Sequence, residues 1–208
     1  MKTKFYLGTL LVLAIHVMVK SQTPANLAFE HNDKFVLGYA YYTEQEKREF
    51  STVQDPSELI IKAEELIEKS NRIKKEAAYK PSPERERLLS YSKEIMKEAE
   101  IRKIAASELL AYYNRIEFSM MKSSFISALE NYNEFDSTTI TSKKLLLSAV
   151  RNYKFAKQIR EEAYAHEQLS SIIASLHMAE EKEVLAIANI VKAHEILRSS
   201  KPIIIAQR

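Results

Sequence analysis

The chain has 208 residues and a formal net charge of +3, from 31 lysines and arginines against 28 aspartates and glutamates. It has no cysteine, which excludes disulfides, thiolate metal sites and thiol nucleophiles. It has only two glycines, which argues against hairpin-rich β folds and phosphate-binding glycine loops. The abundance of charged residues together with Ala, Leu and Ile is typical of long helices.

Residues 1–21 have the pattern of a secretory signal peptide. Two lysines precede an apolar run over residues 5–19, and the small residues Val19 and Ser21 stand before a cleavage site at Gln22. The apolar run is shorter than the roughly 20 residues of a transmembrane helix. We therefore expect an exported protein, periplasmic or secreted to the cell surface, with an uncleaved anchor as the alternative.

The signal peptide carries the whole positive excess. It contains Lys2, Lys4 and Lys20 and no acidic residue, so cleavage leaves 28 basic and 28 acidic residues. A neutral mature chain gives no argument for binding nucleic acid or an anionic membrane surface. We expect no nucleic-acid partner and no stable membrane insertion after cleavage.

Residues 23–50 have a mixed pattern. Thr23-Pro24 resembles a helix start, and apolar side chains then follow at helical spacing. Residues 35–42 are also rich in β-prone side chains. We favour helix over strand here, with a break near Ser51–Asp55.

The first well-marked helix begins after Asp55. Asp55 can cap the helix, Pro56 suits its first position, and Glu58 would complete a capping box. The helix is expected to run to about Tyr79, where Lys80-Pro81-Ser82-Pro83 ends it because proline cannot continue a helix.

Two long helices are expected after this break. The first begins at Ser82–Pro83 and runs to about Asn133. The polar stretch 136–139 is rich in capping residues, and a second helix is expected from about Ile140 to Ser199. At 1.5 Å per residue, each would be roughly 75–90 Å long.

These elements predict an all-α fold, an elongated antiparallel bundle of three or four helices with long heptad-patterned helices. The bundle forms one domain over residues 22–200, and residues 201–208 form an extended tail. The number of helices depends on whether the break at Ser51–Asp55 is a sharp reversal.

Small side chains recur every seven residues in the predicted helices. They are Ala63, Ser70 and Ala77; then Ser92, Ala99 and Ala106; then Ala149, Ala156, Ala163 and Ser170. Residues at this spacing stay on one face of a slightly underwound helix and let neighbouring backbones approach closely. The pattern predicts core seams and left-handed supercoiling.

The segment from Ala63 to Ala106 also carries a family resemblance. It contains Ala63-Glu64-Glu65-Leu66, Lys75-Glu76-Ala77 and Lys97-Glu98-Ala99. It resembles the Ala/Leu/Glu/Lys-rich helical repeats in proteins exported by Bacteroidota, and the Ser21-Gln22 junction is similar to signal cleavage sites common there. The resemblance implies a scaffolding or interaction role at the cell envelope, without a catalytic motif.

The histidines do not form a recognisable metal site. None of His31, His166, His177 and His194 is preceded at three residues by an acidic side chain, as a helical di-iron site requires. No Gly-x-Ser-x-Gly nucleophile motif occurs. We therefore predict a non-enzyme, with no catalytic, cofactor-binding or metal-ligating residue, and expect Glu162 to make an ordinary surface contact with His166.

Three regions are candidates for contacts with a partner. They are an aromatic N-terminal segment (Phe29, Phe35, Tyr39, Tyr41, Tyr42 and Phe50), the tip Asp136–Ser142, and the apolar tail Ile203–Ile205. A second aromatic group follows on the long helix: Tyr112, Tyr113, Phe118, Phe125, Tyr132 and Phe135.

The sequence thus predicts an exported, non-enzymatic scaffold or interaction module of the cell envelope, which binds a protein partner. A periplasmic holdase-type chaperone with long helical arms is the alternative. Heptad helices also self-associate, so the sequence is compatible with a homodimer as well.

Overall fold

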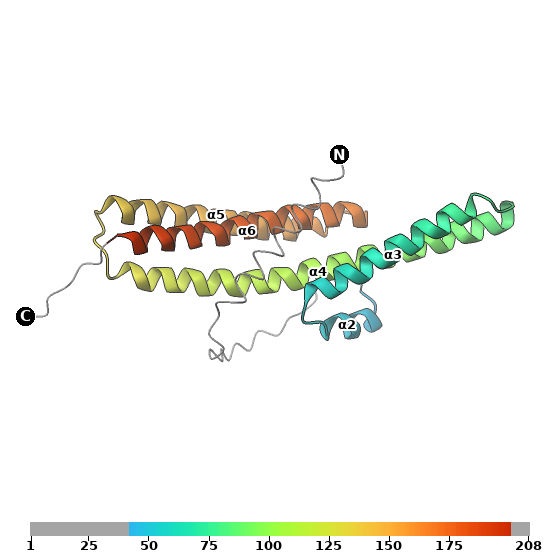
Figure 1. Ribbon diagram of the computed structural model, residues 1–208, viewed down its shortest axis with the longest axis horizontal. Coiled ribbons are helices and arrows are strands. Elements are labelled where there is room, and N and C mark those ends of the chain that lie inside the picture. The colour runs from blue at the N-terminus through green and yellow to red at the C-terminus, as the bar shows by residue number, and fades with distance from the viewer. Residues whose placement is uncertain (1–41, 201–208) are drawn as a thin grey trace, which may run out of the picture. The chain divides into compact units, whose positions relative to one another are not determined.

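The computed structural model describes residues 42–200, all of which belong to one structural unit. Within this range the protein is all-α and contains no strand (Figure 1). Its helices are α2 (Glu44–Ser51), α3 (Pro56–Ala77), α4 (Ser82–Leu129), α5 (Ser137–Ala163) and α6 (Leu169–Ser199). The predicted all-α helical bundle is confirmed, whereas the expected signal peptide and the tail 201–208 lie outside the described residues.

The predicted N-cap Asp55 and the predicted first helical residue of α3 are confirmed, and the capping-box role of Glu58 stays a prediction. The Asp55 side chain accepts a hydrogen bond from the Ser57 amide at 3.0 Å, and Pro56 is the first helical residue. The helix ends at Ala77, slightly before the expected end. The chain then turns, and α4 begins at Ser82 as predicted.

The prediction of one helix from Ile140 to Ser199 is wrong. The chain leaves the helix after Ala163 and starts α6 at Leu169. A hydrogen bond joins Asn189 of α6 to Ser148 of α5, and an ion pair joins Arg160 to Glu183, so the two helices run antiparallel. The reversal brings apolar faces of both halves onto one core.

Helix α4 is shared by two packing arrangements. Its first part pairs with α3, and its later part packs against α6, which also packs along α5 (Figure 1). At 1.5 Å per residue, its 48 residues span about 72 Å. The described residues therefore form a two-helix hairpin, α3 with α4, which continues through α4 into a three-helix bundle.

The seam between α3 and α4 is built from the predicted small residues. Ala63, Ser70, Ser92 and Ala99 are fully buried. The Ser70 hydroxyl donates to the Ser92 carbonyl at 2.9 Å, and the Ser92 hydroxyl donates to the Ser70 carbonyl at 3.1 Å. A hydroxyl reaches the facing backbone only when the helices lie very close, so this pair fixes their register.

The seam between α5 and α6 differs from the prediction in one residue. Ala149, Ala156 and Ala163 are fully buried, but Ser170 lies beyond the reversal and is exposed. The facing small residues are on α6, at the same seven-residue spacing: Ala179, Ala186 and Ala193, all fully buried. Ala156 packs with Ala179, and Ala149 belongs to the same cluster as Ala186 and Ala193.

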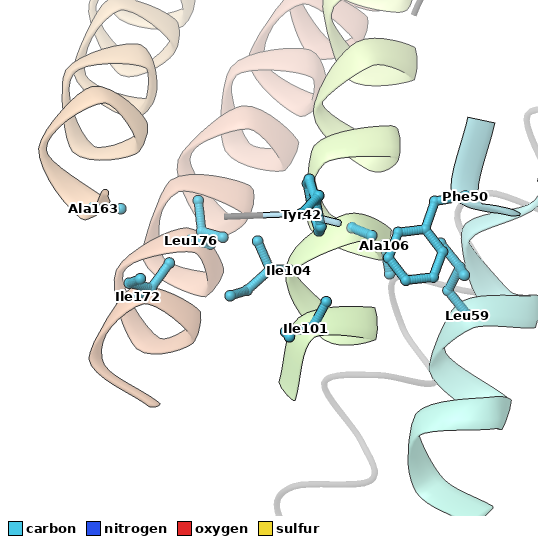
Figure 2. Close-up of a cluster of buried hydrophobic side chains, with 10 residues drawn as sticks. Tyr42, Phe50, Leu59, Ile101, Ile104, Ala106, Ala163, Ile172 and Leu176 are labelled. Carbon is cyan, nitrogen blue, oxygen red and sulfur yellow. The ribbon is translucent and has the colours of Figure 1, made fainter. Parts of the chain in front are cut away.

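One core cluster joins all five helices. Leu59 and Phe50 lie on one side of α4, while Ile172 and Leu176 of α6 lie on the other, with Ile104 among them (Figure 2). All five side chains are nearly fully buried. At about 25 cal/mol per Å² of buried apolar surface, such a cluster strongly stabilises the junction between hairpin and bundle.

Candidate functional site

The described part of the aromatic N-terminal segment belongs to the core. Tyr42 and Phe50 are buried and pack edge to face, with ring centroids 5.6 Å apart. Arg102 lies over the Phe50 ring and pairs with Glu49 at 2.7 Å. These two aromatic side chains are therefore not available to a partner, and Phe29, Phe35, Tyr39 and Tyr41 lie outside the described residues.

The tip Asp136–Ser142 is only partly a surface. Asp136 caps α5, because its side chain accepts the Thr138 amide at 2.7 Å. Those hydrogen bonds from Thr138, first from its hydroxyl and then from its amide, lower the pKa of Asp136. Thr139 and Ser142 are buried, which leaves Ile140 as the large exposed side chain of this segment.

A buried polar network connects α4, α5 and α6. The Arg160 guanidinium donates to both carboxylate oxygens of Glu183, at 2.6 and 3.0 Å, and to the Ser107 hydroxyl at 3.0 Å. The Asn114 amide donates to Glu183 at 2.8 Å. Glu183 is almost fully buried. A buried carboxylate needs a cation and hydrogen bonds to offset its lost hydration, and the bidentate bonds from Arg160 and the bond from Asn114 provide them.

The electrostatics of this network favour a structural role. Burial would lower the pKa of Arg160, but the hydrogen bond and charge of Glu183 raise it. Burial, helped by the Glu183 charge, raises the pKa of Tyr153, whose ring stacks on Phe118 at 4.2 Å. Both Glu183 oxygens accept hydrogen bonds from side chains of other helices, so the network orients α4, α5 and α6 relative to one another.

A second buried carboxylate joins the helices near the core cluster. The Tyr164 hydroxyl donates to Glu108 at 2.6 Å, and the Tyr42 hydroxyl donates to it at 3.3 Å. Tyr164 lies directly after α5, so this contact helps hold the chain reversal between α5 and α6. Sequence reasoning missed both buried carboxylates, because Glu108 and Glu183 lie among many exposed glutamates.

The described histidines are His166, His177 and His194, and each has different surroundings. His166 lies beside Ser175, with 3.3 Å between the hydroxyl and Nε2, while Glu162 instead accepts from Gln158 at 2.7 Å. Each of these two side chains thus forms a hydrogen bond with another residue, and the expected surface contact between Glu162 and His166 stays a prediction. Within residues 42–200 no group of three acidic or histidine side chains is placed to hold a metal ion.

Large apolar side chains remain exposed at both helix connections beside α4. Tyr79, between α3 and α4, is 89% exposed, and Phe135, between α4 and α5, is 87% exposed. Further exposed apolar side chains lie along the helices: Ile61, Leu89, Tyr91, Met120, Ile126, Met178 and Leu185. Single exposed apolar residues are ordinary, but nearly bare aromatic rings at two turns mark surfaces suited to a partner.

None of the helices within residues 42–200 is both long enough and apolar enough to cross a membrane. Comparison with protein-family models, with curated proteins and with solved structures finds no match. The chemistry of the described residues is therefore the basis for a functional assignment.

Proposed function

We propose that the protein is an exported, non-enzymatic helical scaffold or protein-interaction module of the cell envelope. The observation that carries the proposal is the contrast between the interior of the bundle and the two helix connections that flank α4. Inside, the charged side chains of the bundle core bond to one another across helices. Outside, Tyr79 and Phe135 present aromatic rings where α4 begins and ends. Tyrosine and phenylalanine are enriched at protein interfaces, which favours a protein partner.

The export part of the proposal depends on the first 21 residues. Cell fractionation should place the protein outside the cytoplasm, and N-terminal sequencing should find Gln22 as the first residue of the mature chain. Recovery of the uncleaved chain from the cytoplasm would contradict export. These measurements separate the question of localisation from the question of partners.

The interaction part is tested by photo-crosslinking in intact cells. A photoreactive residue in place of Phe135 or Tyr79 should give a discrete adduct of one size. The matched control carries the same residue at Lys74, an exposed position on α3, and should give none. No adduct from either turn, or equal adducts from the control, would contradict the proposal.

A holdase-type chaperone is the second candidate, favoured by the α3–α4 hairpin. This arm carries the exposed side chains of Ile61, Tyr79 and Tyr91, which an unfolded chain would contact. A holdase should give adducts of many sizes and suppress aggregation of an unfolded outer-membrane protein. A single adduct without suppression favours the interaction module.

A further inference from the structure

One face of α5 carries basic side chains that form no ion pair within residues 42–200. From Ser137 to Arg160 the helix contains six basic residues, Lys143, Lys144, Arg151, Lys154, Lys157 and Arg160, and no acidic residue. Three of these have partners: Lys143 pairs with Glu134, Lys157 with Glu161 and Arg160 with Glu183. The other three, Lys144, Arg151 and Lys154, are exposed, and no ion pair joins them to any residue in the range 42–200.

Large apolar side chains lie between these cations on the same face. Ile140, Leu147 and Phe155 are 42%, 59% and 49% exposed. At 100° per residue, the six side chains fall within a stripe about 100° wide that lies opposite the buried alanine seam. We call this stripe the α5 face: Ile140, Lys144, Leu147, Arg151, Lys154 and Phe155.

The spacing of the α5 face matches that of a helix-packing surface. Ile140 and Leu147 are seven residues apart, as are Lys144 and Arg151. Side chains that recur every seven residues remain in contact with a second helix over several turns. From Ile140 to Phe155 the face is about 22 Å long, which is four turns of a partner helix.

We infer that the α5 face docks an acidic amphipathic helix of a protein partner. Apolar side chains of that helix would pack between Ile140, Leu147 and Phe155, and its glutamates or aspartates would oppose the three unpaired cations. The inference rests on the proposed interaction function, and it adds the chemistry of the partner.

An anionic membrane surface fits the α5 face less well. A helix that lies in a bilayer interface presents a continuous apolar face to the lipid. The continuous apolar face of α5, with Ala149 and Ala156, is already buried against α6. On the α5 face the apolar side chains are separated by cations, an arrangement that suits interdigitation with a helix of opposite charge.

The binding test uses the full mature chain and a labelled synthetic helical peptide. The peptide has leucine at heptad positions a and d and glutamate at e and g; its counterpart has lysine in place of glutamate. Fluorescence anisotropy should show at least about tenfold tighter binding of the acidic peptide, since three ion pairs of ordinary strength give that ratio. Added salt should weaken the binding.

Charge reversal locates the site. The variant K144E/R151E/K154E should weaken binding of the acidic peptide by about tenfold or more. The matched control K74E/K93E/K97E changes the net charge equally, at exposed lysines of the α3–α4 hairpin, and should bind as the original chain does. Circular dichroism checks that both variants stay helical. Leu147→Ala should mainly speed dissociation.

Several results would overturn the inference. They are equal binding of both peptides, equal weakening by the control variant, α5-dependent binding to phosphatidylglycerol vesicles with none to the peptide, and a dimer that the α5 reversal dissociates. If the reversal variant still forms the adduct seen in cells at Phe135 or Tyr79, the interaction function stands and the α5 assignment falls. If the chain with the photoreactive residue and an unaltered α5 gives no adduct, the proposed function falls, whether or not the acidic peptide binds.

Discussion

Replacing Ala99 with leucine tests the close packing of the α3–α4 hairpin. Ala99 is fully buried in the seam. The helices are antiparallel and Ser70 faces Ser92, so a step of seven residues along each helix places Ala63 opposite Ala99. A leucine at this position would meet the facing backbone, because the seam has room only for a methyl group.

The expected cost follows from two effects. Extra methylene groups forced into a packed site destabilise a protein by about 1–3 kcal/mol. Separating the helices would also stretch the reciprocal Ser70–Ser92 hydrogen bonds, and each such bond contributes about 0.5–1.5 kcal/mol. We therefore expect Ala99→Leu to lower the free energy of unfolding by about 2–6 kcal/mol.

The assay is urea unfolding monitored by circular dichroism of the helices. The slope of the unfolding free energy against urea concentration is compared between variants. Lys97→Leu is the control, because Lys97 is exposed on the same helix and leucine and lysine have similar helix propensities. Its unfolding free energy should change by less than about 0.5 kcal/mol. An equally small change in Ala99→Leu would refute the close-packed seam.

Three further changes probe the bundle. Arg160→Met should lower the free energy of unfolding in denaturant by about 3–5 kcal/mol, because it leaves the buried Glu183 carboxylate without its cation. The R160M/E183L double variant should recover this stability. No recovery in the double variant would contradict an ion-pair role. Asp136→Asn should reduce the loss of thermal stability in acid, because hydrogen bonds from Thr138 lower the pKa of Asp136. The stabilisation by these bonds is present above the ordinary carboxyl pKa and is lost as the pH falls through the lowered pKa. Burial lowers the pKa of His194 below 6.5, so its contribution to stability should be full above pH 6.5 and should decline as the pH falls through the lowered pKa. His194→Asn should flatten this decline in thermal stability with falling pH. An unchanged dependence of thermal stability on pH in this variant would refute the role of His194.

The elements with local signals were predictable from the sequence. Asp55 and Pro56 mark the start of α3, and the prolines near Ser82 mark the turn before α4. The seam residues followed from their seven-residue spacing, since a buried small residue must recur with the period of the packed helix. These features depend on short stretches of chain, which a sequence displays directly.

The reversal between α5 and α6 was not predicted, because residues 164–168 contain neither proline nor glycine. What ends the helix there is tertiary: Tyr164 bonds to Glu108, and Ile172 packs on the core. A signal was nevertheless present. The alanine spacing of seven resumes at Ala179, nine residues after Ser170, and this change of phase indicates that one continuous helix does not run through both.

The buried network was also beyond local reasoning. Ser107, Asn114, Arg160 and Glu183 come from three helices, and each has ordinary neighbours in the sequence. Their burial depends on how α4, α5 and α6 pack. The cations of the α5 face were hard to recognise for a related reason, because 31 basic and 28 acidic residues nearly balance over the chain and conceal an uneven distribution between helices.

The shared helix α4 has a consequence for how such a chain can change length. The hairpin and the bundle meet at Ile104 and Leu59, while the seam beyond that point repeats every seven residues. Inserting seven residues in α3 and seven in the facing part of α4 would repeat the seam once more and move the turn at Tyr79 outward by about 10 Å, leaving the bundle untouched. The hairpin is thus a spacer of adjustable length, set in heptad steps, on a fixed base.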